Sequence, residues 1–229
     1  MLSGRRSEFF NGIMDEAPIL LGDIPFGILF GASAVASQIP VLAVQGMSLI
    51  VFAGSAQFVA VQLMSAGASG LVVLMVILVV NLRHVLYSAS VAPYLQHLKP
   101  AWKILLSYLL TDEAYAVAVT HYHREGALPY KHWYFLGAGL MLWSTWQIST
   151  GIGILVGTQL STSFPIRFFL PLTFIALVVP LLKDRSTLAS ALVAGAIGLA
   201  TLDFPFKTGL LLAGLCGILT GLFVERRHP

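Results

Sequence analysis

Charged residues are scarce in this sequence, and a soluble protein needs many of them on its surface. Only 10% of the 229 residues are charged, whereas 57% are hydrophobic, and the mean hydropathy is +0.86. An ordinary soluble domain carries about 25% charged residues. The composition therefore argues against a soluble enzyme and predicts a protein that lies mostly in a lipid bilayer.

Cysteine is nearly absent, and so are the signs of nucleotide or nucleic-acid binding. The single cysteine, Cys216, lies in the last apolar segment, so it supports neither a disulfide framework nor a multi-cysteine metal site. No Gly-rich loop ending in Gly-Lys-Ser or Gly-Lys-Thr is present. The net charge of +3 comes from basic residues scattered singly at segment ends. We expect no cofactor, no metal and no nucleic acid partner.

Long apolar runs are abundant. Runs of about 17 to 25 residues, the length that crosses a bilayer core, recur along the chain and predict an all-α membrane bundle of seven or eight transmembrane helices. The expected spans are Ala17–Ser37, Val41–Met64, Gly70–Val91, Lys103–His121, Trp133–Gly157, Ile166–Leu182, Leu188–Leu202 and Thr208–Val224. Small residues at four-residue spacing, such as Gly27 with Gly31 and Gly153 with Gly157, predict close helix packing within the chain.

The ends of the chain are expected to lie on the cytoplasmic side. With eight crossings, that side carries more of the lysines and arginines, as the positive-inside rule requires. We expect residues 1–16 to form a cytoplasmic N-terminal segment, residues 17–224 the transmembrane domain, and residues 225–229 a short basic tail.

The first span contains Asp23 and Pro25, which predict a helix that either breaks or begins there. Proline removes a backbone donor, and Asp23 is suited to cap the helix that follows. A break inside the bilayer would offer a helix N-terminus to a carboxylate, whereas a helix that simply begins at Asp23 would carry no site. The sequence Asp-Ile-Pro-Phe at residues 23–26 returns as Asp-Phe-Pro-Phe at 203–206, a weak hint of an inverted repeat.

Ionisable residues interrupt the third and fourth spans, where each costs about 2.5 to 3.5 kcal/mol to insert. Arg83 and Asp112 lie at similar depth from the loop between these spans, about 12 to 14 Å by helical rise. This predicts an ion pair between them. The pair either serves only to neutralise two buried charges, or leaves Glu113 as a surplus carboxylate that exchanges protons or meets an ammonium group.

Other polar residues inside the spans complete the candidate site. Gln57 either bonds across to another helix or lines a cavity, and His84 is either simply hydrogen-bonded or able to move protons. The candidate substrate-binding residues are Asp23, Gln57, Asn81, Arg83 and Asp112, and the candidate proton-coupling residues are Asp112, Glu113 and His84.

Four motifs carry a resemblance to a known family. They are Gly-Asp-Ile-Pro-Phe-Gly at 22–27, Phe-Ala-Gly-Ser-Ala-Gln-Phe at 52–58, Asn-Leu-Arg-His-Val-Leu-Tyr at 81–87 and Leu-Thr-Asp-Glu-Ala-Tyr at 110–115. In this order and spacing the chain resembles the AzlC family of bacterial branched-chain amino acid exporters. The resemblance implies a bacterial cytoplasmic-membrane protein that exports valine, leucine, isoleucine or similar amino acids and works with a small membrane subunit of the AzlD type.

The expected function is therefore transport. With no ATP-binding motif, export would draw on an ion gradient, most simply of protons. An intramembrane enzyme is the rival from another class, and its catalytic pair would have to be Asp23 and Asp112, which match no protease motif. A channel and a purely structural membrane subunit are the remaining alternatives.

Overall fold

The computed structural model describes residues 4–124, 130–159, 182, 184–202, 204 and 208–227. Every regular element in this part of the chain is a helix, as the composition predicts. The chain divides into two compact units. The first unit holds Met1–Val61 and Ile77–Thr162, and the second holds Gln62–Val76 and Ser163–Pro229.

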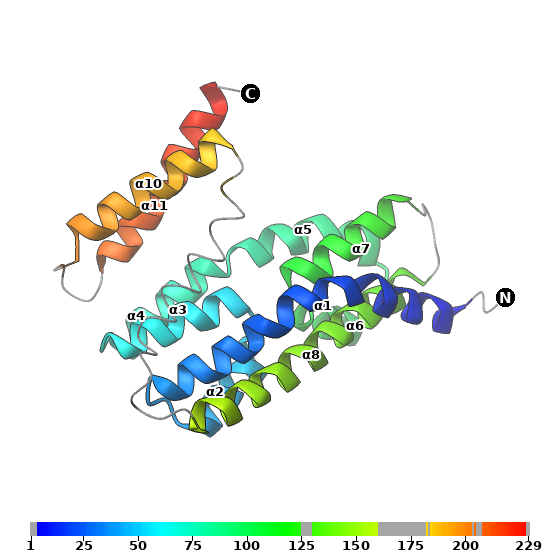
Figure 1. Ribbon diagram of the computed structural model, residues 1–229. Helices are drawn as coiled ribbons and strands as arrows, with labels where there is room; N and C mark the ends of the chain where they lie inside the picture. The colour runs from blue at the N-terminus through cyan, green and yellow to red at the C-terminus, as the bar shows by residue number, and fades with distance from the viewer. Residues whose placement is uncertain are drawn as a thin grey trace. The chain divides into compact units, whose positions relative to one another are not determined.

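Two long helices, α1 (Arg5–Ala36) and α8 (Lys131–Gln159), pack along each other at the centre of the first unit's contacts (Figure 1). They run in the same direction and touch where glycines remove side chains. A Cβ atom on Gly27 would lie 2.6 Å from the Cβ of Ser149, and one on Gly153 would lie 2.8 Å from the carbonyl carbon of Ile28. The predicted role of these small residues in close packing within the chain is confirmed.

The predicted break in the first helix is wrong. Helix α1 is continuous through Pro18 and Pro25, and it begins at Arg5 rather than at the expected Ala17. Asp23 therefore lies inside the helix and does not cap it. Contacts with α8 on both sides of Pro25, at Gly12 and at Gly27, hold the helix in place despite the missing hydrogen bond. Membrane helices tolerate proline when neighbouring helices support them in this way.

The second and third predicted spans, in contrast, are interrupted. The chain from residue 41 to residue 65 forms α2 (Val41–Val51) and α3 (Gly54–Ser65), separated by Phe52 in the left-handed conformation at φ 38° and ψ 49°. A single straight helix cannot contain such a residue. The next stretch forms α4 (Gly70–Val80) and α5 (Arg83–Leu95), which are separated by a turn at residues 81–82. Hydropathy averages over these short breaks and misses them.

The fourth predicted span, Lys103–His121, is a hairpin of two short helices. Helix α6 (Pro100–Tyr108) has Leu109 as its C-cap, and α7 (Asp112–Arg124) begins three residues after that cap. The hydroxyl of Thr111 accepts a hydrogen bond from the backbone N–H of Ala114 at 3.3 Å, which caps the new helix.

The contacts of α6 and α7 with α8 give their directions. Trp102, near the start of α6, packs on Trp133 with ring centroids 5.2 Å apart. Tyr108, at the end of α6, accepts a hydrogen bond from Trp143 Nε1 at 2.7 Å, so α6 runs parallel to α8. Tyr122, near the end of α7, donates to the backbone carbonyl at the first residue of α8 at 2.9 Å. Helix α7 therefore returns to the end from which α6 started, and the fourth span does not cross as a single helix.

The second unit contains an antiparallel pair, α10 (Arg185–Ala200) and α11 (Thr208–Arg227). The hydroxyl of Ser190 donates to the carbonyl of Gly217 at 2.7 Å, where the helices approach closely. Hydrogen bonds from the Thr187 backbone and from the Ser186 and Thr187 side chains lower the pKa of Asp184, which caps α10. The predicted span Ile166–Leu182 and the Asp-Phe-Pro-Phe motif lie almost wholly outside the described residues.

The described helices suit a membrane. Two of them, Arg5–Ala36 and the run Gly70–Leu95 that joins α4 and α5, are long and apolar enough to cross one. Large apolar side chains face outward, among them Leu42 at 88% and Ile50 at 80% exposed, as expected of lipid-facing residues. The count of seven or eight crossings stays a prediction.

Candidate functional site

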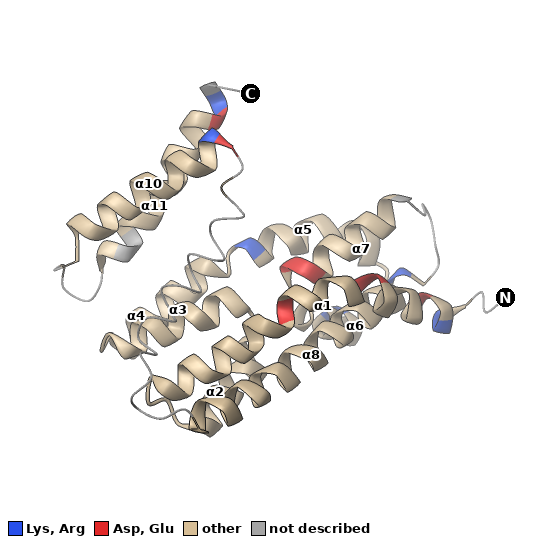
Figure 2. Ribbon diagram, in the orientation of Figure 1, with Lys and Arg blue, Asp and Glu red and all other residues tan. Residues whose placement is uncertain are grey.

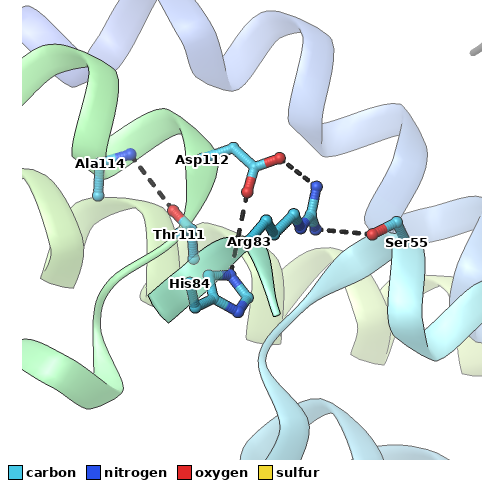
Figure 3. Close-up of polar contacts among 6 residues, drawn as sticks. All are labelled: Ser55, Arg83, His84, Thr111, Asp112 and Ala114. Carbon is cyan, nitrogen blue, oxygen red and sulfur yellow. Dashed lines mark hydrogen bonds and ion pairs between the residues drawn. The ribbon is translucent and has the colours of Figure 1, made fainter. Parts of the chain in front are cut away.

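The N-termini of three short helices meet in the first unit. Arg83, the first residue of α5, forms an ion pair with Asp112, the first residue of α7, through Nη1 and Oδ2. Its Nη2 donates to the hydroxyl of Ser55 near the start of α3 at 2.7 Å (Figure 3). The ion pair predicted from helical depth is confirmed. The breaks that hydropathy misses are what bring these helix ends together.

The side-chain charges of Arg83 and Asp112 interact with the partial charges of the helix ends on which they lie. Helix N-termini carry partial positive charge, which favours Asp112 on α7 and disfavours Arg83 on α5. The ion pair offsets the second effect. About a third of each side chain is exposed, 31% for Arg83 and 37% for Asp112, so the pair is neither fully buried nor at the surface. His84 Nε2 lies 3.9 Å from Asp112 Oδ1, too far for a hydrogen bond.

Buried polar atoms without a protein partner gather around the same junction. In the described part of the chain they include Gln57 Nε2, Asn81 Oδ1, Arg83 Nε, His84 Nε2 and Asp112 Oδ1. Native proteins leave few such atoms, and each one calls for an explanation. Here they belong to four of the predicted substrate-binding residues and to His84. The arrangement provides donors and acceptors for a polar ligand.

Gln57 follows the first of the two alternatives that its sequence position left open, a hydrogen bond across to another helix. Its side chain is fully buried, and its Oε1 accepts a hydrogen bond from Trp146 Nε1 of α8 at 3.1 Å. The amide therefore bonds across to another helix, while its Nε2 stays without a partner among the described residues.

A second group of polar residues lies between α1 and α7 and consists of Glu16, Asp23 and Glu113. We call it the acidic cluster. Figure 2 shows acidic segments of α1 close to the start of α7, and the three carboxyl groups are near enough to interact electrostatically. Glu16 is fully buried, and neither of its carboxyl oxygens has a protein partner, while Asp23 has one buried unpartnered oxygen.

Glu16 is the residue that sequence reasoning missed. The sequence predicts a place in the cytoplasmic segment 1–16 for this residue, because it precedes the apolar run. A signal was nevertheless present. Glu16 lies four residues before Leu20 and seven before Asp23, which places all three on one face of a helix that begins earlier than expected.

An apolar cavity of about 240 Å³ lies between α5, α6 and α8. Its wall includes Val91, Leu95, Leu106 and Leu110, and its polar lining residues are Ser88, Gln96, Lys103 and Ser107. Leu110 is two residues from Asp112, so the cavity and the junction are neighbours along the chain. No group of three or more potential metal-ligating side chains is found in the described part of the chain.

Comparison with known proteins decides the family. The model of the AzlC protein family matches residues 18–160, which contain the whole junction. The chain belongs to the AzlC family. The inner membrane protein YgaZ of Escherichia coli is 30% identical over 93% of this chain and 89% of its own length. A membrane protein of Archaeoglobus fulgidus, of no stated function, is 31% identical over 84% of each chain. No solved structure matches.

Membership of the AzlC family also makes this chain a helical membrane protein of a transporter-type family. A membrane protein of Helicobacter pylori is 33% identical over 67% of this chain and 68% of its own length, which extends the likeness to a third genus. The name of each relative places it in a membrane. The outward-facing apolar side chains of the first unit agree with that placement.

Proposed function

We propose that this chain is the larger subunit of an exporter for branched-chain or similar apolar amino acids in a bacterial cytoplasmic membrane. It would work with a small hydrophobic subunit of the AzlD type and draw energy from a proton gradient. The meeting of three helix N-termini at Arg83 is the observation that carries this proposal.

The junction suits the two charged ends of an amino acid. Backbone N–H groups at the starts of α3 and α7, together with Arg83, favour a carboxylate. The unpartnered Oδ1 of Asp112 is an acceptor for an ammonium group. In transporters with discontinuous helices, half-helix N-termini point at anionic substrate groups in the same way. Asn81 and Gln57 add an amide oxygen and an amide nitrogen that lack partners.

The apolar cavity suits the aliphatic side chain. Its volume of about 240 Å³ is slightly smaller than the 300 to 1,000 Å³ typical of drug-sized ligands. A substrate of amino acid size is therefore a better match than a larger molecule. The aliphatic wall would favour a branched hydrocarbon chain over a polar one because a polar side chain would lose its hydrogen bonds to water there.

The proposed orientation places the N-terminus in the cytoplasm. Because α1 and α8 run in the same direction, Arg5 and Arg6 at the start of α1 lie at the same end of the first unit as Lys131 at the start of α8. The positive-inside rule favours that end on the cytoplasmic side.

Uptake of labelled leucine into inverted membrane vesicles tests the proposal. Vesicles would contain this chain alone, the small partner alone, or both, with an imposed pH gradient. We expect accumulation only when both subunits are present, and collapse of the gradient should abolish it. No accumulation in any combination would refute the proposed substrate.

Two carboxylate variants test the roles of the residues. Asp112→Asn removes the ammonium partner and should abolish uptake, whereas Glu113→Gln should act on proton coupling instead. Glu225→Gln, the same chemical change at an exposed position of α11, serves as the matched control. Equal and mild effects of the first two variants would contradict a mechanism centred on carboxylates.

A further inference from the structure

Glu16 is the most thoroughly buried carboxyl group in the described chain that has no partner. Its exposed fraction is 0%, and no hydrogen bond or ion pair reaches either of its oxygens. The ion pairs among the described residues join Arg83 or His84 to Asp112 and His121 to Glu8, and none of them includes Glu16, Asp23 or Glu113.

Among the residues that the structure describes, no ion pair supplies Glu16 with a positive charge. Asp23 lies two turns further along α1, about 10 Å by helical rise, and Glu113 faces it from α7. Tyr134 of α8 is a further titratable neighbour. Its hydroxyl donates to Asp15 at 2.6 Å, and its ring stacks on His121 of α7 with centroids 3.7 Å apart. Helix α2, which also contacts α1, contains no titratable residue. Arg83 pairs with Asp112 and donates to Ser55, and no ion pair among the described residues joins it to the three acids.

Ionised carboxylates that share a buried site without a cation repel one another and lose their hydration, so the charged forms are costly there. A buried carboxylic acid without a cation is accommodated in its protonated form, and it must give up that proton when water or a cation reaches it. Ionisable residues inside a membrane protein mark ion pathways and proton relays. The acidic cluster has the composition of such a relay, because three acids gather there and no ion pair among the described residues includes any of them.

We propose that Glu16, with Asp23 and Glu113 beside it, is the proton-carrying site that couples this transporter to a pH gradient. This inference rests on the proposed function because it names the group that moves the coupling ion. In each cycle the O–H bond of the Glu16 carboxyl group breaks, and the proton passes to water on the side of low proton activity. A proton from the opposite side then re-forms the bond.

The position of the acidic cluster separates coupling from substrate binding. Glu113 directly follows Asp112 in the first turn of α7, so one helix start contributes Asp112 to the junction and Glu113 to the acidic cluster. A movement of α7 would therefore act on both places at once. At the far end of α7, His121 Nε2 lies 3.0 Å from Glu8 Oε2, and this pair lies nearer the N-terminal end of α1.

The experiment compares two modes of transport in proteoliposomes containing both subunits. Exchange of labelled for unlabelled leucine needs no net proton movement, whereas accumulation against a gradient does. One coupled proton supports about tenfold accumulation for each unit of pH difference. Glu16→Gln should reduce that ratio from about ten to about one, while exchange stays measurable. Glu225→Gln should accumulate leucine as the unmodified protein does. Normal accumulation by Glu16→Gln would overturn the inference.

A second measurement does not depend on transport. The infrared carbonyl stretch of protonated carboxyl groups is recorded for the reconstituted protein at neutral pH. We expect a band that weakens in Glu16→Gln and persists in Glu225→Gln. If the band depends on Glu16 but no leucine is transported, the result supports Glu16 as a protonated site and refutes leucine as the substrate. If leucine is transported and the band does not depend on Glu16, the inference fails and the proposed function stands.

Discussion

The Arg83–Asp112 ion pair allows a prediction that separates a structural role from a functional one. Removing one partner of a fully buried pair costs about 3 to 5 kcal/mol, whereas an exposed pair is worth about 0 to 1 kcal/mol. Since 31% and 37% of the two side chains are exposed, we expect Asp112→Asn to destabilise the protein by about 2 kcal/mol. The stranded guanidinium at the start of α5 is the physical cause.

A double-mutant cycle measures the pair itself. Arg83→Gln combined with Asp112→Asn removes both charges, so the double variant should be more stable than the sum of the single effects by about 1 to 2 kcal/mol. Ser55→Ala, which removes the neutral acceptor 2.7 Å from Arg83, is a graded control and should cost about 1 kcal/mol. Denaturant titration in detergent micelles, followed by tryptophan fluorescence, gives each free energy of unfolding. Additivity of the single effects would refute the reasoning.

Transport by the double variant then distinguishes the two roles. If the pair only neutralises two buried charges, leucine transport should return together with the restored stability. We expect stability to return and transport to stay lost, because the substrate carboxylate and ammonium group would both have lost their partners. Leucine transport by the double variant at the rate measured for Ser55→Ala, which keeps both charges, would count against a binding role for Arg83 and Asp112.

Four further changes test the fold. Gly153→Ala should destabilise the α1–α8 contact by about 2 kcal/mol or more because its new Cβ meets the backbone of Ile28. Gly151→Ala on the same helix meets nothing within 4 Å and should stabilise it by up to about 1 kcal/mol, so equal effects in thermal unfolding would contradict the packing. Gln38→Gly should stabilise the protein by about 0.5 to 1 kcal/mol in the same assay, because Gln38 has φ 64° just after α1 ends. A loss of stability in this variant would argue against that conformation. Thr111→Ala should cost about 1 kcal/mol and speed hydrogen exchange at the first turn of α7, while unchanged exchange would exclude the cap.

Several parts of the site could be predicted from sequence because they depend on the free energy of placing single residues in an apolar segment. Arg83 and Asp112 are expensive inside an apolar span, so a partner had to exist, and equal depth from their loop identified it. The glycine spacing on α1 and α8 predicted close packing for a similar reason, since removing side chains from one helix face is useful only if another helix lies there.

Other parts could not be predicted, because they depend on contacts between distant residues. Pro25 has the chemistry of a helix breaker, yet α8 supports α1 on either side of it. Phe52 and Leu109 look like ordinary apolar residues, yet the chain turns at both. Glu16 precedes the apolar run, so the sequence predicts a place in the cytoplasmic segment, although the packing of α1 buries it completely.

Hydropathy and the cost of buried charge are properties of single residues and short windows. The amino-acid sequence alone therefore indicates a lipid environment and the polar residues that lie in it. Only the tertiary structure decided how those residues are grouped. It joined three helix starts at Arg83 and gathered a separate acidic cluster around Glu16. Helix direction and helix breaks are settled by packing between segments far apart in the chain, and that packing is what converts the polar residues into a site.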